Sequence, residues 1–236
     1  MPEKNTEHPC GLLLFDKPQG ITSHDAVYIL RRKLGIKKIG HGGTLDPLAT
    51  GLLILLAGKA TKRQSALQGC SKIYSGTITF GHETETWDME GKIIKTAPVP
   101  DLNNAELLKN SINKLNGNIE QQVPPYSAIK YQGRKLYEIA RSGEKVPVIM
   151  RKVQVNWLEC KAVSPDTVFF LTEVSGGTYI RTLAKDLGLA MGSCAYLSSL
   201  RRKKIGQYDV KDAITEEELK SASKEEIISR LLPIDS

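Results

Sequence analysis

Apolar residues along the chain follow two repeating patterns, and the shorter one marks strands. Residues 52–57 form an unbroken apolar run, which fits a buried strand or a short core helix. In residues 73–81 apolar and polar side chains alternate, with Tyr74 on the more apolar face. Residues 11–15, 152–162 and 167–175 also have strand character, the last two on either side of a Ser-Pro-Asp turn. We expect the segments other than 52–57 to be strands, and residues 52–57 to be either a buried strand or a short core helix.

The longer pattern, with the period of an α-helix, appears in three other segments. Residues 23–34 carry it, with Ser23 as the expected N-cap and Gly35 as the stop. Residues 107–115 carry it after Asn103 or Asn104, and residues 116–117, Asn-Gly, end that stripe. A third helix is expected to start near Ile180, after a glycine-containing junction, and the chain from residue 214 onward has a helical, charge-rich character.

A glycine-rich loop, residues 40–51, comes between the first helix and the apolar run. Its glycines allow sharp turns and leave room for a substrate, while Pro47 favours an extended conformation for Asp46. We therefore expect Asp46 on a stiff loop outside any helix, anchored by the apolar segment behind it. Spacing alone favours an ordinary turn residue for this aspartate, since Asp before Pro is common in turns.

The net positive charge of the chain indicates what kind of partner it binds. The chain has 236 residues, enough for one large domain or one domain with a small appendage, and its 33 Lys and Arg exceed its 26 Asp and Glu to give a net charge of +7. This excess favours a polyanionic partner. The cations cluster near the segments described above, where they fit phosphate contacts, at residues 31–33, 37–38, 59–63 and 201–204.

Cysteine spacing and hydropathy argue against several protein classes. Cys10, Cys70, Cys160 and Cys194 are widely scattered, with no Cys-x-x-Cys pair, so we expect free thiols and no metal site. No apolar run approaches the roughly 18 to 20 residues that span a bilayer, and the first ten residues lack an apolar signal region. We expect a cytoplasmic protein that does not associate with a membrane.

Four short strings occur in chain order and resemble one protein family. They are Gly-Gly-Thr-Leu-Asp-Pro-x-Ala-Thr-Gly at residues 42–51, Lys-Ile-Tyr at 72–74, Gly-Thr-Tyr-Ile-Arg-Thr-Leu at 177–183 and Leu-Arg-Arg at 200–202. Together they resemble the motifs of the TruB family, tRNA pseudouridine synthases that act on the T arm. In that family the Asp is catalytic, the Tyr stacks on the target base and the Arg pairs with the Asp. The resemblance thus implies catalytic roles for Asp46, Tyr74 and Arg181.

Binding roles follow from the same resemblance. It implies that Tyr179 lines the uracil pocket, that Leu200 packs near the base and that His41 inserts into the RNA fold. Lys17 belongs to a Lys-Pro pair that packs beneath the catalytic loop in the family, a structural role before a catalytic one. Residues 84–91 resemble the family's Thr-x-Thr-x-Asp-x-x-Gly turn, in which Asp88 is either an RNA-side or a supporting residue.

The resemblance extends from Gly11 to about Gly206 and implies the organisation of the chain. We expect a disordered N-terminal tail over residues 1–9 and a catalytic domain over residues 10–236, with an RNA-binding thumb insert at about 121–150. The expected fold is α+β, with a central mixed, largely antiparallel sheet flanked by helices. The small C-terminal RNA-binding PUA domain that many relatives carry is not evident.

The implied activity is isomerisation of the T-loop uridine of tRNA, position 55, to pseudouridine. The base would be flipped out, its glycosidic bond cleaved and a new bond formed, without metal or cofactor, by a protein expected to be a monomer. Asp46 can serve as nucleophile, as electrostatic stabiliser at C1′ or as the base that removes a ribose proton, and the sequence does not choose among these roles. Arg181 beside it would keep the acid ionised.

Two other function classes make different predictions. A noncatalytic RNA-binding or RNA-folding module predicts that a change of Asp46 is silent. A nucleoside hydrolase or glycosidase predicts that free uracil is released, and it usually needs a second carboxylic acid as general acid.

Overall fold

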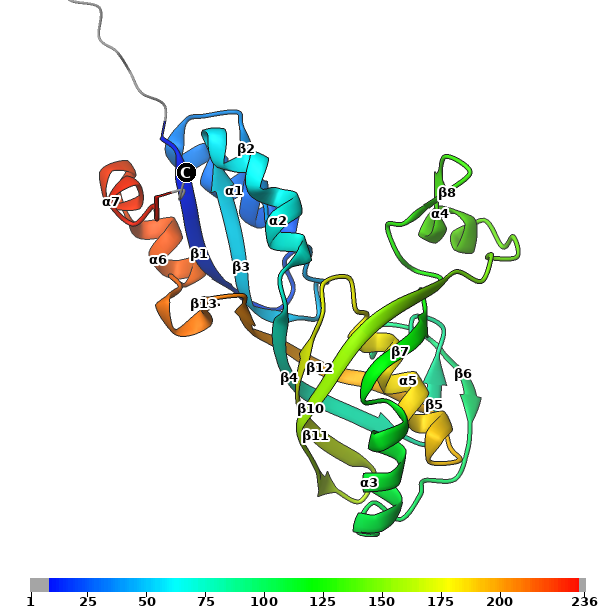
Figure 1. Ribbon diagram of the computed structural model, residues 1–236. Helices are drawn as coiled ribbons and strands as arrows, with labels where there is room; N and C mark the ends of the chain where they lie inside the picture. Colours follow the sequence, from blue (N-terminus) through cyan, green and yellow to red (C-terminus); the bar gives the residue numbers. More distant parts are fainter. Residues whose placement is uncertain (1–8, 234–236) are drawn as a thin grey trace, which may run out of the picture. The chain divides into compact units, whose positions relative to one another are not determined.

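A computed structural model describes residues 9–233 of the chain, which divide into two compact units (Figure 1). The first unit contains residues up to 72 and from 201 onward, and the second contains residues 73–200. The tail expected over residues 1–9 lies outside the described residues, apart from Pro9. Among the described residues, no helix is long and apolar enough to cross a membrane.

The first unit is built on the apolar runs of the sequence. β1 (Gly11–Lys17) pairs antiparallel with β3 (Thr50–Ala57), and β2 (Ile39–His41) also pairs antiparallel with β3. β12 (Ala195–Ile205) begins in the second unit, and its last residues run parallel to β3. The short β13 (Tyr208–Asp209) pairs with that end of β12. Because nearly every residue of β1 and β3 is buried, the run at 52–57 is confirmed as a buried strand.

Helices complete the first unit. α1 (Ser23–Leu34) ends at Gly35 as expected, but its N-cap is Thr22 and not Ser23. Thr22 and Asp25 form a capping box, in which the Thr22 hydroxyl accepts from the amide of Asp25 and the Asp25 carboxylate accepts from the amide of Thr22. The remaining helical segments are η1 (Gly58–Arg63), α2 (Gln64–Gly69), η2 (Val210–Asp212), α6 (Glu216–Ser221) and α7 (Lys224–Ser229).

The second unit contains the longer strands. Its sheet has the order β12-β4-β11-β10-β7, with β4 (Lys72–Phe80), β7 (Gly117–Gln122), β10 (Met150–Ser164) and β11 (Thr167–Val174). β10 pairs antiparallel with both β11 and β7. The alternation in β4 is confirmed, since Tyr74, Ile78 and Phe80 lie on its buried face and the residues of the opposite face are half-buried. A side chain at Gly76 would collide with the main-chain oxygen of Ser199, so glycine is needed for this close approach.

Two helices and a small hairpin accompany this sheet. α3 (Ala105–Lys114) is capped by Asn104, and α5 (Ile180–Ala190) buries the apolar face that its spacing predicts. The hairpin of β5 (His82–Thr84) and β6 (Ile93–Thr96) precedes α3. The strand pairs of the first unit are antiparallel except for β3 with β12, which is parallel. Together with the helices that flank the sheet, this mixed pairing confirms the expected α+β fold.

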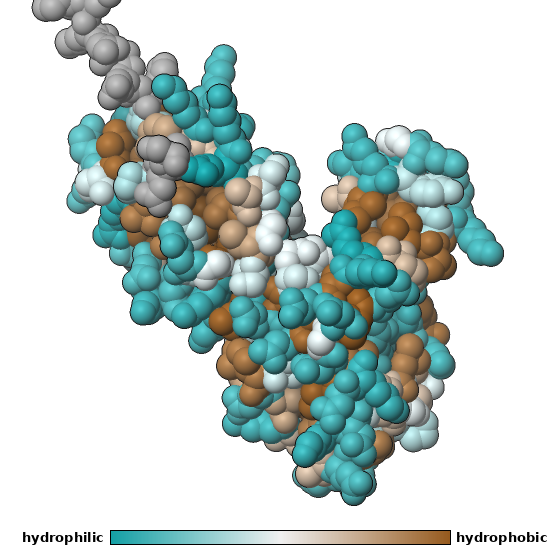
Figure 2. Space-filling view, in the orientation of Figure 1, coloured by the Kyte–Doolittle hydropathy of each residue, from teal (hydrophilic) through white to brown (hydrophobic). Residues whose placement is uncertain are grey.

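The segment after β7 folds on a small core of its own. A hairpin of β8 (Lys130–Tyr131) and β9 (Arg134–Lys135) leads into α4 (Leu136–Arg141). Leu136 and Ile139 of α4 form a buried cluster with Val123. Figure 2 shows hydrophilic residues over the outer surface of this segment and hydrophobic residues beneath α4.

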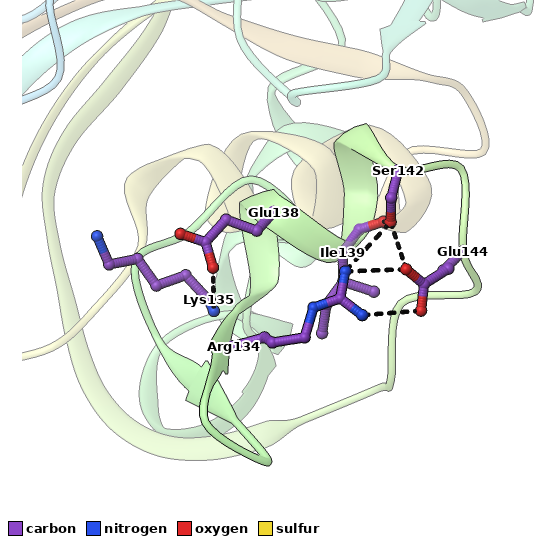
Figure 3. Close-up of polar contacts among 6 residues, drawn as sticks. All are labelled: Arg134, Lys135, Glu138, Ile139, Ser142 and Glu144. Atoms are coloured by element: carbon purple, nitrogen blue, oxygen red, sulfur yellow. Dashed lines mark hydrogen bonds and ion pairs between the residues drawn. The ribbon is translucent and has the colours of Figure 1, made fainter.

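Polar contacts close the tip of the same segment (Figure 3). Arg134 makes a bidentate ion pair with Glu144, with distances of 2.9 and 3.0 Å, and the Ser142 hydroxyl donates to the same carboxylate. This network lowers the pKa of Glu144 from its ordinary value to about 2, chiefly through the Arg134 hydrogen bond. The segment therefore has a defined structure despite its short elements.

Candidate active site

The glycine-rich loop that carries Asp46 connects β2 to β3 and contains no helix, as its sequence predicts. Leu45 and Leu48, on either side of Asp46, are buried, while Asp46 itself is half-buried. The Asp46 carbonyl accepts from the amide of Ala49 at 3.0 Å, and the Pro47 carbonyl accepts from the amide of Gly20 at 2.9 Å. The loop is thus a compact turn pinned by its two buried leucines.

Lys17 lies directly against this loop. Its side chain is fully buried, and its Nζ donates to the carbonyls of Pro18 and Ile21, both at 2.8 Å. A longer contact of 3.5 Å reaches the carbonyl of Pro47, the residue after Asp46. Lys17 therefore joins the turn that follows β1 to the Asp46 loop.

A second buried cation contacts the loop from β12. Arg202 is 1% exposed, and its guanidinium donates to main-chain carbonyls of Gly43, Thr44 and Leu52. The expectation that residues 201–204 contact phosphates is therefore wrong for Arg202. Successive strand residues point to opposite faces, so the neighbouring Arg201 is more exposed and pairs with Asp16 at 2.7 Å.

Two further side chains shape the loop. The Ser23 hydroxyl accepts from the amide of Leu45 at 2.8 Å and donates to its carbonyl at 3.0 Å, which explains why Ser23 is not the helix cap. His41 Nδ1 accepts from the amide of Gly43 at 3.3 Å. Burial lowers the pKa of His41, and the charges of His24 and Arg202 lower it further. A neutral imidazole suits its role as acceptor.

In the second unit, Arg181 occupies the first turn of α5 and is largely buried. Its guanidinium forms an ion pair with Asp88 at 3.3 Å and donates to the carbonyls of Thr86 and Tyr126, each at 3.1 Å. Asp88, buried in the turn after β5, also accepts from the amide of Glu90 at 3.1 Å. Asp88 is therefore a supporting partner of Arg181.

Tyr179 is the N-cap of α5, and a buried amide holds its main chain. Gln121, on β7, donates from Nε2 to the carbonyl of Tyr179 at 2.9 Å and accepts from its amide at 2.7 Å. On the same two segments, the Thr182 hydroxyl donates to the carbonyl of Gln122 at 2.9 Å. Gln121 was not predicted from the sequence, where its only local signal is its position just before the segment that follows β7.

The Lys-Ile-Tyr string spans the boundary of the two units. Lys72 Nζ donates to the carbonyls of Leu67, Gln68 and Cys70 and so caps the end of α2. Burial, followed by the charge of Arg202, lowers the pKa of Lys72 to about 8. Tyr74 is buried in β4, and Leu200 is half-buried in β12.

The predicted site residues are thus distributed over both units. Lys17, His41 and Asp46 belong to the first unit, where Lys17 and the Asp46 loop are in contact. The others belong to the second: Tyr74, Tyr179, Arg181 and Leu200. The residues that hold these groups were not identified as such from the sequence: Ser23, Arg202 and Gln121.

Comparison with known proteins gives consistent matches along the chain. Residues 31–180 match the TruB family pseudouridylate synthase N-terminal domain, and residues 181–236 match the tRNA pseudouridylate synthase B C-terminal domain. The tRNA pseudouridine synthase B of Endomicrobium trichonymphae is 45% identical over 95% of this chain and 96% of its own length. The Aquifex aeolicus protein of the same name is 44% identical over 96% of this chain and 78% of its own length.

Solved structures agree on the fold. A Cbf5–Nop10–Gar1 complex contains a chain that matches with a TM-score of 0.64 and 28% identity, over 88% of this chain. The present chain spans about half of that chain's length, 53%. The archaeal box H/ACA sRNP Nop10–Cbf5 complex matches with a TM-score of 0.67 at 24% identity, which supports the fold alone. On the extent and identity of the sequence matches, this chain belongs to the TruB family of pseudouridylate synthases, isomerases that convert uridine in RNA to pseudouridine.

Proposed function

We propose that this chain converts the uridine at position 55 in the T loop of tRNA to pseudouridine, with Asp46 as the catalytic carboxylate. The observation that carries the proposal is the Asp46 loop itself. Its family string places an aspartate on a turn whose main chain is held by Ser23, Lys17 and Arg202. Relatives that are 44 to 45% identical over nearly the whole chain are named tRNA pseudouridine synthase B.

The reaction explains why a fixed carboxylate is needed. The N1–C1′ bond breaks, the uracil turns, and C5 bonds to C1′, while the C5 proton leaves and N1 gains a proton. Because no atoms are lost overall, the reaction is an isomerisation that acid–base and electrostatic groups can catalyse. Asp46 would act at C1′ or on a ribose proton, and the three roles named above stay open.

The other predicted residues complete the proposal. Arg181 would pair with Asp46 and keep it ionised, Tyr74 would stack on the target base, and Leu200 and Tyr179 would line the uracil pocket. His41 would enter the space left by the extruded nucleotide. Extrusion has a free-energy cost of about a few kcal/mol, which contacts of this kind would offset.

Recognition of tRNA would depend on shape and phosphate contacts. The net charge of +7 favours RNA, and the thumb segment between β7 and β10 carries exposed basic residues such as Lys130 and Arg134. We propose that this segment closes over the T loop and that the protein works as a cytoplasmic monomer.

One assay tests the function directly. The purified protein is incubated with unmodified tRNA, pseudouridine is mapped at single-nucleotide resolution, and free uracil is measured. We expect pseudouridine at position 55 without released uracil. Release of uracil would support a hydrolase instead.

A variant pair tests the role of Asp46. Asp46→Asn should abolish product while the Kd for tRNA stays within about threefold of the wild-type value. Asp101→Asn, which changes an exposed aspartate in another loop, is the matched control and should behave as wild type. Full activity of Asp46→Asn would exclude the proposal and favour a noncatalytic RNA-binding module.

A further inference from the structure

We propose that Arg202 is a positioning residue of the reaction, which fixes the loop that presents Asp46 without contacting RNA. The proposal rests on the proposed function of Asp46. The first observation is that Arg202 belongs to a run of basic residues and yet is buried. Three of the four residues 201–204 are partly or fully exposed, whereas the Arg202 side chain is 1% exposed. A buried guanidinium is not available to bind a phosphate.

The hydrogen bonds of Arg202 reach the loop on both sides of Asp46. Nη2 donates to the carbonyl of Gly43 at 3.0 Å and Nη1 to that of Thr44 at 3.2 Å. Nε donates to the carbonyl of Leu52, beyond the other end of the loop, at 2.7 Å. The planar guanidinium carries its donors in a fixed fork, so one rigid group sets the spacing of these three carbonyls.

The backbone is shaped to allow this contact. Gly51 pairs with Arg202 between parallel β3 and β12, and its φ of +99° is a conformation that favours glycine. A side chain at Gly51 would collide with the main-chain oxygen of Arg202. The loop glycine Gly43, with φ +149°, lies against Nη1, which would be 3.8 Å from a Cβ atom there. Gly51 of the family string thus lets β12 approach β3 closely enough to bring Arg202 to the loop.

Neighbouring groups respond to the same charge. Arg202 contributes to lowering the pKa of His41, at the start of the loop, and that of Lys72, at the end of α2. Lys17 also supports the loop, but its contact with Pro47 is long, at 3.5 Å. Arg202 is therefore a buried side chain that holds the main chain on both sides of Asp46, at Gly43 and Thr44 and at Leu52.

Three substitutions of Arg202 test the proposal. Arg202→Met and Arg202→Gln remove the fork, and Arg202→Lys keeps the charge but offers one nitrogen for three separated carbonyls. Single-turnover pseudouridine formation with saturating enzyme should fall about 100-fold in Arg202→Met and about tenfold in Arg202→Lys, since small displacements of a reacting group have effects of this size. The Kd for tRNA should stay within about threefold in both, because the side chain does not face solvent.

Hydrogen exchange separates positioning from general loss of stability. Amides of residues 43–52 should exchange faster in Arg202→Met, while those of β10 and β11 in the second unit keep the wild-type rate. Val210→Ala is the control, because it weakens the core of the first unit without removing a hydrogen bond to the loop, since the Val210 side chain carries no polar atom. It should lower Tm yet leave both the rate constant and the exchange of residues 43–52 unchanged.

Several results would overturn the proposal. One is a folded Arg202→Met with a rate constant close to wild type, and another is a loss of rate fully explained by a weaker Kd. Failure of all three variants to fold, Lys included, would make Arg202 a core residue and not a positioning residue. These outcomes are distinct from failure of the proposed function, which would appear as an active Asp46→Asn variant.

Discussion

The two units hold their candidate catalytic groups by opposite means. In the first unit, Lys17 and Arg202 are buried cations that donate to main-chain carbonyls of the Asp46 loop. In the second unit, the group that is held is itself a cation, Arg181, and a buried carboxylate, Asp88, pairs with its side chain. The first arrangement fixes a backbone that presents an acid, while the second fixes a side chain directly.

This difference predicts two kinds of variant. Removing a donor from the first unit should displace the loop and reduce the rate more than the stability, because the carbonyls lie within a few residues of Asp46. Removing Asp88 from the second unit takes away a buried carboxylate that pairs with a buried guanidinium, which should reduce stability first. Measuring both quantities for each variant therefore tests the comparison.

Asp88→Asn should have the largest effect on stability. The side chains of Asp88 and Arg181 are only 3% and 10% exposed, and breaking a buried ion pair from one side destabilises a protein by about 3 kcal/mol or more. Urea unfolding measures this change. The double variant Asp88→Asn/Arg181→Gln should recover part of the loss, since the buried charge is gone. If the two single changes are simply additive, the ion pair is not what fixes Arg181.

Gln121→Leu should have the next largest effect on stability. It removes both hydrogen bonds to the main chain of Tyr179, so we expect a loss of about 2 kcal/mol in unfolding free energy. We also expect a rate about tenfold lower, because Tyr179 is a proposed wall of the uracil pocket. Gln122→Leu, on the next residue of the same strand, is the matched control. An equal effect of the two substitutions would contradict the role of the Gln121 amide.

Ser23→Ala and Thr22→Ala sharpen the comparison in the first unit. Both remove a hydroxyl hydrogen bond and should destabilise by about 1 kcal/mol each. Only Ser23 contacts the Asp46 loop, through Leu45, so only Ser23→Ala should also lower the single-turnover rate. Equal rates for the two variants would show that loop geometry does not limit the reaction.

Glu144→Gln should have the smallest effect, because the Arg134–Glu144 pair is exposed. Since the folded pKa of Glu144 is about 2, below its ordinary 4.5, the stabilisation is complete above pH 4.5 and is lost as pH falls through about 2. Amide exchange of residues 134–144 should therefore be faster in the variant at pH 7, and the two proteins should converge near pH 2. A constant difference across this range would exclude the ion pair as its cause.

Local sequence was sufficient for several of the strands and helices, whereas the candidate groups came from the family resemblance. The unbroken run at 52–57 and the alternation at 73–81 are confirmed as β3 and β4, because burial on two faces or one leaves a direct trace in the residue order. The N-cap of α1 was predicted at Ser23, one residue after its position in the structure. Thr22 has an acid three residues later, Asp25, and this capping-box spacing was the available signal.

The supporting contacts could not be predicted in the same way. Whether Arg202 points to solvent or to the loop depends on the register of β12 beside β3, which pairs residues about 150 positions apart. Gln121 likewise meets Tyr179 only through tertiary structure. Nothing local distinguishes these residues from exposed polar ones, so strand periodicity finds the elements but not the contacts between them.

The central claim is that a rigidly held loop places the carboxylate of Asp46, and Asp46→Glu tests it most directly. This variant keeps the acid but moves it by one methylene on a loop that is fixed at its ends. We predict that single-turnover pseudouridine formation falls by about 100-fold or more while tRNA affinity is unchanged, because displacement by about 1 Å has an effect of this size. A rate within about tenfold of wild type would show that the loop adapts freely, and would contradict the account.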